Sequence, residues 1–103
     1  MVLIARTYFV YILTNHPHGT LYIGVTNSIR RRIWQHRNGT NAGFAHRYGL
    51  QRLVHLERFE DVQNAIRREK EIKGWLRRRK VELIERENPR WADLADEVMA
   101  WDD

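Results

Sequence analysis

With 103 residues, of which 43% are hydrophobic and 30% charged, the chain is long enough for one globular domain, and a disordered chain is excluded. It has no cysteine, which excludes disulfides and thiolate metal sites. Its 18 Lys and Arg residues against 13 Asp and Glu give a formal net charge of +5, which favours a polyanion such as nucleic acid as partner, with an anionic membrane surface or a solvated basic helix as alternatives.

The N-terminal stretch is apolar but lacks the pattern of a membrane anchor or a signal peptide. Arg6 and Thr7 interrupt it, and no small-residue cleavage site follows. No apolar run in the chain approaches the roughly 18 residues that a membrane span needs. We therefore expect no contact with a membrane and a cytoplasmic protein.

Two strands joined by a turn are predicted first. Residues 7–14, TYFVYILT, are rich in β-branched and aromatic residues, as a buried strand should be. Pro17 and Gly19 indicate a turn over residues 15–20, and residues 21–26, LYIGVT, read as a second strand. The two strands predict a hairpin.

A helix, a third strand and more helices follow. Ser28 can cap a helix over residues 29–37, a short helical turn can form between residues 43 and 49, and residues 50–59 predict a third strand with imperfect alternation. Asp61 then caps a long helix from residue 62 to residue 78 or beyond, and residues 80–88 continue or restart it.

The C-terminal tail is predicted to form a packing helix. Its apolar residues fall close to one helical face: Trp91, Leu94, Ala95, Val98 and Trp101. We divide the chain into a domain of residues 1–88 and a C-terminal packing helix or tail of residues 89–103. The order of elements predicts an α/β (α+β) fold, with a three-stranded, mainly antiparallel sheet flanked by helices.

One carboxylate lies on the wrong side of the long helix. At about 100° per residue, the apolar positions of this helix fall on one arc: Val62, Ala65, Ile66, Ile72 and Leu76. Glu69 falls in the middle of that arc, although glutamates are seldom fully buried unless something pairs with them.

Two further polar groups face inward. If the residue numbers of paired hairpin positions have an odd sum, Tyr11 and Tyr22 lie on one face of the sheet. Gly24 then leaves an open space beside them, where a backbone or ligand could approach. The alternative is that both tyrosines belong to the core, with their hydroxyls at its rim. Arg32 and His36 lie four residues apart beside the inward stripe of the first helix, although an arginine there can also extend its head into water.

Together these residues could hydrolyse a phosphodiester. A carboxylate can hold a divalent cation, and an arginine can stabilise charge on phosphoryl oxygens. A tyrosine or histidine can move the proton of an attacking water. Each residue is on a face that permits the set to meet.

The same residues resemble a known family. "FVY" at Phe9 to Tyr11 and "YIG" at Tyr22 to Gly24 resemble the paired motif of the GIY-YIG nucleases, with Phe9 in place of the first glycine. "YIGVTNSIRRRIWQH", "RYGLQRLVHLERF" and "AIRREKEIKGW" resemble its small stand-alone bacterial members, which are similar to the N-terminal incision domain of the UvrC excision-repair subunit. The likeness runs from about residue 8 to residue 85.

The resemblance implies a GIY-YIG endonuclease-like fold and a role for each site residue. Tyr11, Tyr22, Arg32, His36 and Glu69 match catalytic positions. Glu69 would hold a single Mg²⁺ or Mn²⁺, Arg32 would stabilise the pentacovalent phosphate, and Tyr11 or His36 would activate the water.

Substrate binding is expected on the basic surface of the domain. The residues assigned to it are Gly24, Arg30, Arg31 and Lys73. Phosphate contacts position a duplex without reading its sequence, so binding should be largely non-sequence-specific. We expect a metal-dependent DNA endonuclease for repair or for branched or damaged DNA, with or without a protein partner or homo-oligomer. The alternatives are a catalytically weak nucleic-acid-binding module and a partner-activated subunit whose Trp-rich tail binds the partner.

Overall fold

The computed structural model describes residues 6–38 and 49–101 and contains a three-stranded antiparallel sheet with strand order β2-β1-β3. Its strands are β1 (Tyr8–Thr14), β2 (Leu21–Thr26) and β3 (Arg52–Phe59). The central strand β1 is buried from Phe9 to Thr14, as expected for a run of β-branched and aromatic residues between two neighbours. The predicted fold class is confirmed.

The register puts both tyrosines on one face. Tyr11 pairs with Gly24 and Leu13 with Tyr22, so the paired positions have an odd sum, as predicted. Between β1 and β3 the register shifts: Ile12 pairs with His55 but Leu13 pairs with Leu53. This β-bulge inserts one extra residue into β3, which accounts for its imperfect alternation.

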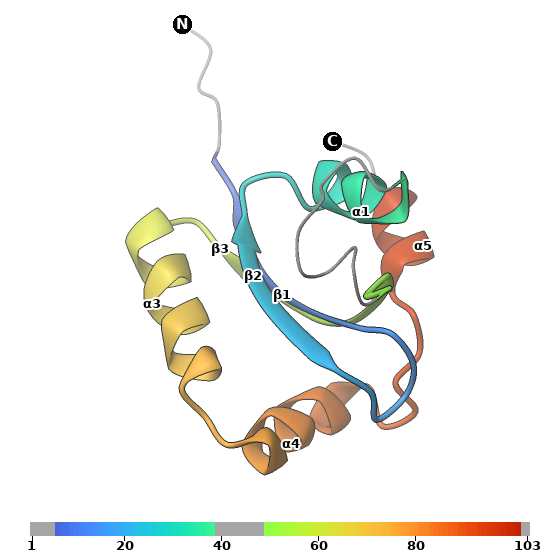
Figure 1. Cartoon of the computed structure of the whole chain (residues 1–103). Helices are drawn as coiled ribbons and strands as arrows, with labels where there is room; N and C mark the ends of the chain where they lie inside the picture. Colours follow the sequence, from blue (N-terminus) through green and yellow to red (C-terminus); the bar gives the residue numbers. More distant parts are fainter. Residues whose placement is uncertain (1–5, 39–48, 102–103) are drawn as a thin grey trace, which may run out of the picture.

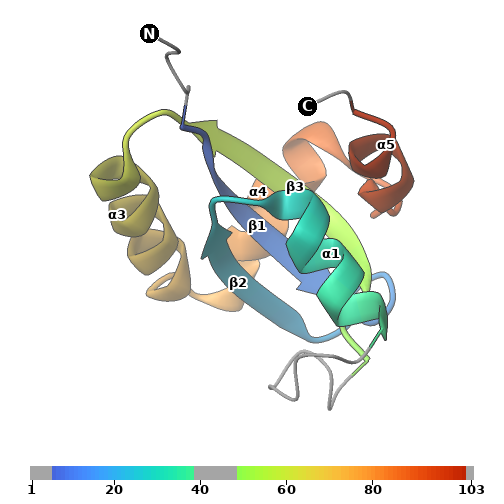
Figure 2. The ribbon, with the colours of Figure 1, turned by 90° about the horizontal axis from the view of Figure 1, so that it is seen from above.

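Helices cover both faces of the sheet. On one face lie α1 (Ile29–Asn38) and α5 (Ala95–Met99), and on the other lie α3 (Val62–Lys73) and α4 (Arg77–Glu87) (Figure 1). Seen from above, α1 and α3 lie to either side of β2 (Figure 2). Side chains carried by these two helices can therefore approach the same strand from its two faces.

The helix predicted to run from residue 62 to residue 78 or beyond is interrupted, so that prediction is wrong. A second helix follows the interruption, which confirms the alternative that the helical pattern restarts. The α3 helix ends where Gly74 donates its N–H to the carbonyls of Lys70 and Glu71, and α4 begins at Arg77. Glycine has poor helix propensity, and the break lets α4 turn back to bury Leu83 and Ile84 against the sheet.

The predicted apolar arc of this segment is also narrower than expected. Only Ala65 and Ile72 are buried on α3, while Val62 and Ile66 are each 37% exposed and Leu76, in the break, is 76% exposed. The contact of α3 with the sheet therefore rests on two apolar side chains.

The tail is not one helix with a single apolar face. The α5 helix spans only five residues, and Trp91 precedes it in the left-handed region, at φ 55°. Trp91 is fully buried in the core beneath α3 and α4, whereas Ala95 and Val98 belong to the core beneath α1. The segment passes from one face of the sheet to the other, so the tail contributes to both cores and does not offer Trp91 to a partner.

Part of the predicted helical turn over residues 43–49 lies outside the described residues. Within the described residues, no helix is long and apolar enough to cross a membrane.

Candidate active site

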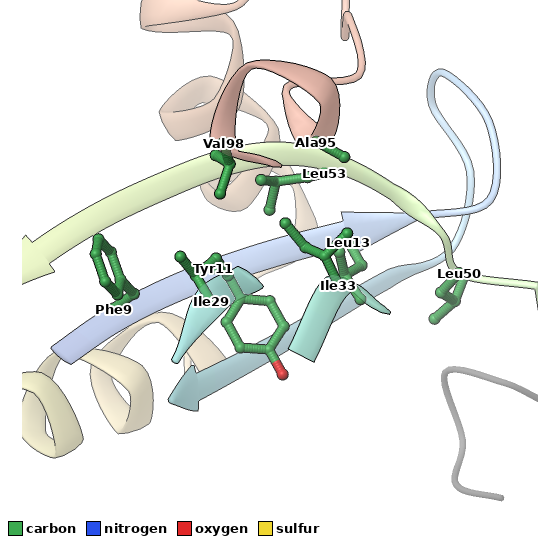
Figure 3. Packing of buried hydrophobic residues seen from close by; sticks show 9 residues of the cluster. All are labelled: Phe9, Tyr11, Leu13, Ile29, Ile33, Leu50, Leu53, Ala95 and Val98. Atoms are coloured by element: carbon green, nitrogen blue, oxygen red, sulfur yellow. The ribbon is translucent and has the colours of Figure 1, made fainter. Parts of the chain in front are cut away.

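Three aromatic rings from the sheet and α1 lie together on the α1 face. The ring centroids of Tyr11 and Tyr22 are 6.2 Å apart, and His36 lies 6.3 Å from Tyr11 and 6.0 Å from Tyr22. Tyr11 extends from β1, and its hydroxyl points away from Leu53 and Val98 (Figure 3). These three residues, which we call the aromatic cluster, lie together, an arrangement that their faces in the sequence analysis permitted.

Gly24 is directly beneath the Tyr11 ring. A Cβ at this position would lie 2.5 Å from Cζ and from Oη of Tyr11, far closer than such atoms approach. The open space expected beside Gly24 is therefore filled by the phenol, and that expectation is wrong. Glycine is needed here because the ring of the paired residue crosses its Cα.

The Tyr11 hydroxyl is a poor acid in this setting. Burial raises its pKa well above the ordinary value of 10.0, and the neighbouring Tyr22 and the charge of Glu69 raise it further, whereas the charge of Arg32 lowers it. Tyr11 therefore stays protonated at neutral pH and has a side-chain hydrogen bond with Tyr22.

His36 is one of the buried residues of α1. It is 4% exposed, and neither Nδ1 nor Nε2 has a partner among the described residues. Burial lowers the pKa of the imidazole below its ordinary 6.5, and the charge of Arg32 lowers it further. The ring is therefore neutral at pH 7, with one nitrogen free to accept a proton.

Arg32 is positioned by α1 to act on the cluster. It lies one turn before His36, is partly buried, and its charge acts on both Tyr11 and His36. Of the arginines before it on the same helix, Arg30 is partly buried and Arg31 is exposed.

Glu69 approaches from α3. Its side chain is 14% exposed, and its charge is among the causes that raise the pKa of Tyr11, so the carboxylate lies within electrostatic range of the cluster. Its Oε2 is 3.3 Å from Nζ of Lys73, one turn further along α3. Since the Lys73 side chain is half-exposed, it can leave Glu69 for another anion.

The residues present fit a cation held by a single protein carboxylate. Among residues 6–38 and 49–101 there is no group of three His, Asp or Glu side chains able to hold a metal ion. Mg²⁺ commonly keeps several waters and takes only one or two carboxylates plus phosphate oxygens. Glu69 could supply a hard oxygen ligand of this kind.

A second set of interacting polar side chains, on β3 and α3, was not predicted from the sequence. His55 Nε2 lies 2.8 Å from Glu57 Oε2, and Arg68 donates to both oxygens of Glu57 at 2.8 and 3.1 Å. Burial alone would raise the pKa of Glu57, but hydrogen bonds and charge from His55 and Arg68 lower it to about 2. Glu57 is therefore ionised, and His55 donates to it. We call His55, Glu57 and Arg68 the Glu57 network; the only sequence signal was a histidine and a glutamate two residues apart on one strand.

The strand pair β1 and β2 brings together a proton acceptor, a positively charged side chain and a carboxylate. A neutral imidazole, a guanidinium and two phenols lie on the α1 face, and a carboxylate acts on them from α3. Such a set can accept a proton from water and stabilise negative charge that develops on an oxygen.

Comparison with known proteins gives consistent matches. The model of the GIY-YIG catalytic domain matches residues 7–82. The UPF0213 protein of Natronomonas pharaonis is 36% identical over 80 residues, which is 78% of this chain and 93% of that protein. The UPF0213 protein of Clostridium perfringens is 40% identical over 76 residues, covering 74% and 81%. The solution NMR structure of the UPF0213 protein of Bacillus halodurans superposes with a TM-score of 0.55 at 31% identity, covering 87% of this chain and 95% of that one.

Proposed function

This chain belongs to the GIY-YIG family, and from that premise we propose that it is a metal-dependent DNA endonuclease that hydrolyses phosphodiester bonds. The family match implies nuclease activity on DNA with a divalent cation. The finer assignment, to repair or to the processing of branched or damaged DNA, follows the resemblance to the incision domain of the UvrC excision-repair subunit.

The observation that carries the proposal is the neutral His36 beside Arg32 and the two tyrosines, with no hydrogen-bond partner in the part of the chain that the structure describes. A buried polar group without a hydrogen bond costs about 1–3 kcal/mol. A ligand or a water at the imidazole would recover that free energy, and a reacting water is the ligand that a hydrolase needs.

His36, and not Tyr11, is the better general base. A base must be unprotonated before it accepts a proton, and Tyr11 keeps its proton at neutral pH because burial raises its pKa. The neutral imidazole needs no prior deprotonation. Tyr11 and Tyr22 then act as hydrogen-bond donors that orient the water or a phosphate oxygen.

Arg32 and Glu69 supply charge. The guanidinium of Arg32 would stabilise the extra negative charge of the pentacovalent phosphate, and Glu69 would hold Mg²⁺ or Mn²⁺. When bound, the cation would neutralise charge on the phosphate oxygens. Lys73, released from Glu69, would bind a neighbouring phosphate together with Arg30 and Arg31, while Gly24 allows Tyr11 to lie close to β2.

A cleavage assay tests the proposal. Purified protein is incubated with nicked, forked and flapped DNA in Mg²⁺ or Mn²⁺, beside Arg32→Ala and Glu69→Ala. We expect cleavage that both substitutions reduce by about 10²–10³, the loss typical of one group that stabilises transition-state charge. Cleavage that survives both substitutions would place the chemistry elsewhere.

One observation favours a second candidate, a nucleic-acid-binding module of low activity. The 3.3 Å contact between Glu69 and Lys73 gives the carboxylate a cationic partner before any metal arrives. Salt-dependent DNA binding without cleavage across all substrates and both metals would favour this candidate.

A further inference from the structure

The Glu57 network connects β3 to the helix that carries Glu69. Arg68, the residue before Glu69, donates from Nε and from a terminal nitrogen to the two carboxylate oxygens of Glu57. On the strand, His55 donates to one of the same oxygens. The acceptor is thus held from two sides, and a two-point guanidinium–carboxylate contact has a defined orientation.

Arg68 and Glu69 flank the buried side of α3 on opposite edges. With about 100° between successive residues, they lie on either side of the line through Ala65 and Ile72. Arg68 reaches toward β3, the edge strand on one side of β1, whereas the charge of Glu69 acts on Tyr11. A rotation of α3 that releases Arg68 from Glu57 therefore also moves Glu69 relative to the aromatic cluster.

Apolar packing alone fixes this rotation poorly. Ala65 and Ile72 are the only buried residues of α3, and Val62 and Ile66, which would widen the contact, are more than a third exposed. The contact between Arg68 and Glu57, by contrast, is directional and partly buried.

We propose that Glu57 is a positioning residue: by holding Arg68 it fixes the rotation of α3, and so directs the Glu69 carboxylate toward the aromatic cluster, where a divalent cation is to be bound. This inference rests on the proposed function, in which Glu69 holds the cation. It assigns a role to Glu57, His55 and Arg68 that differs from stabilisation of the fold.

The first experiment compares Mn²⁺ binding to the whole chain with that of Glu57→Gln. Calorimetric titration of the metal-free protein measures Mn²⁺ affinity directly, without DNA. We expect affinity to fall about tenfold, the lower end of losses seen when residues behind a metal ligand are removed. In cleavage assays the Mn²⁺ requirement should rise by a similar factor, while KM for DNA stays nearly unchanged.

A matched control removes an exposed carboxylate that is not part of the Glu57 network. Glu60→Gln neutralises an exposed glutamate just after β3, with the same change in net charge. Its Mn²⁺ affinity should equal that of the wild type. An equal loss in Glu60→Gln and Glu57→Gln would mean that general electrostatics, and not position, is responsible, and would overturn the proposal.

A double variant separates positioning from folding. Glu57→Gln removes the two-point partner of Arg68 and leaves it only the exposed Glu71, so the variant can lose stability. Glu57→Leu combined with Arg68→Met leaves no unpaired charge on the partly buried side of this contact, since Glu71 is half-exposed, and should recover the thermal midpoint. We expect its Mn²⁺ affinity to remain low. Wild-type affinity in this stable double variant would overturn the positioning role.

The same titration distinguishes this proposal from the proposed function. If Glu69→Gln binds Mn²⁺ as the wild type does, Glu69 is not the ligand and both fail. If Glu69→Gln loses binding while Glu57→Gln retains it, the proposed function stands and the positioning role alone is refuted.

Discussion

His36 and His55 are almost equally buried, at 4% and 5% exposure, yet the protein treats them in opposite ways. His55 donates to an ionised carboxylate that Arg68 also binds. His36 has no hydrogen-bond partner among the described residues. The positive charge of Arg32 lowers the pKa of its imidazole and so keeps the ring neutral.

The difference separates groups that stabilise the fold from groups kept available for a ligand. A buried polar group is normally paired, and an exception needs an explanation. On the side of Glu57 each charge is neutralised within the protein. On the side of the aromatic cluster the protein accepts a cost in stability, which is the usual condition of an active site.

The largest effect is expected from His36→Leu, which tests whether the imidazole of His36 is kept available at a cost in stability. We expect kcat to fall by about 10²–10⁴, the range for loss of a general base. The free energy of unfolding should rise by about 1–3 kcal/mol, because an unsatisfied buried group is removed. Single-turnover cleavage and urea unfolding measure the two quantities. A His36→Leu protein less stable than the wild type would show that the imidazole is satisfied after all.

Low pH should lower the free energy of unfolding through the Glu57 network. The pKa of Glu57 is about 2, below the ordinary 4.5, so its ionised form stabilises the folded state above pH 4.5, and this stabilisation is lost as the pH falls toward 2. The loss is at most about 3 kcal/mol. Urea unfolding at pH 6 and pH 3 should show a larger loss for the wild type than for Glu57→Gln, and equal losses would contradict the pairing.

Gly24→Ala tests how tightly the aromatic cluster is packed. The added methyl group must displace the Tyr11 ring, and overpacking of this kind typically costs about 1–3 kcal/mol. Because the ring moves, the near-UV circular dichroism of the tyrosines should change together with the unfolding midpoint. Gly19→Ala is a poor control because that glycine is also crowded. Ala92→Gly, at an exposed position of the tail, serves as the control.

The smallest effect is expected at Lys73, whose ion pair with Glu69 is half-exposed. Lys73→Ala should change stability by no more than about 0.5 kcal/mol. If Lys73 binds a phosphate, DNA affinity should weaken and the slope of log affinity against log salt should decrease by about 1. An unchanged slope would mean that Lys73 serves Glu69 and not DNA.

Short-range patterns predicted the elements well because they depend on local side-chain chemistry. The alternation of β1 and β2 predicted the shared face of Tyr11 and Tyr22, and the spacing of Arg32 and His36 on α1 predicted their common side. The family motifs matched the same residues, so the composition of the candidate site was accessible before any coordinates.

Features set by contacts between distant segments could not be predicted in this way. Periodicity cannot tell whether an apolar position of α3 meets the sheet, so Val62 and Ile66 were misplaced. Trp91 adopts a left-handed conformation to cross between the cores, which no helical wheel represents. The contact of Arg68 with Glu57 spans 11 residues and depends on the bulge in β3, so no sequence spacing indicated it.

The tail also closes part of a sheet edge. Leu53, on the outer strand β3, donates its N–H to the Asp93 carboxylate at 3.0 Å and accepts the N–H of Leu94 at 2.7 Å. Both hydrogen-bonding groups that this residue would offer to an incoming strand are therefore occupied. A homo-oligomer built by continuing the sheet would therefore have to start from β2 or from the far end of β3.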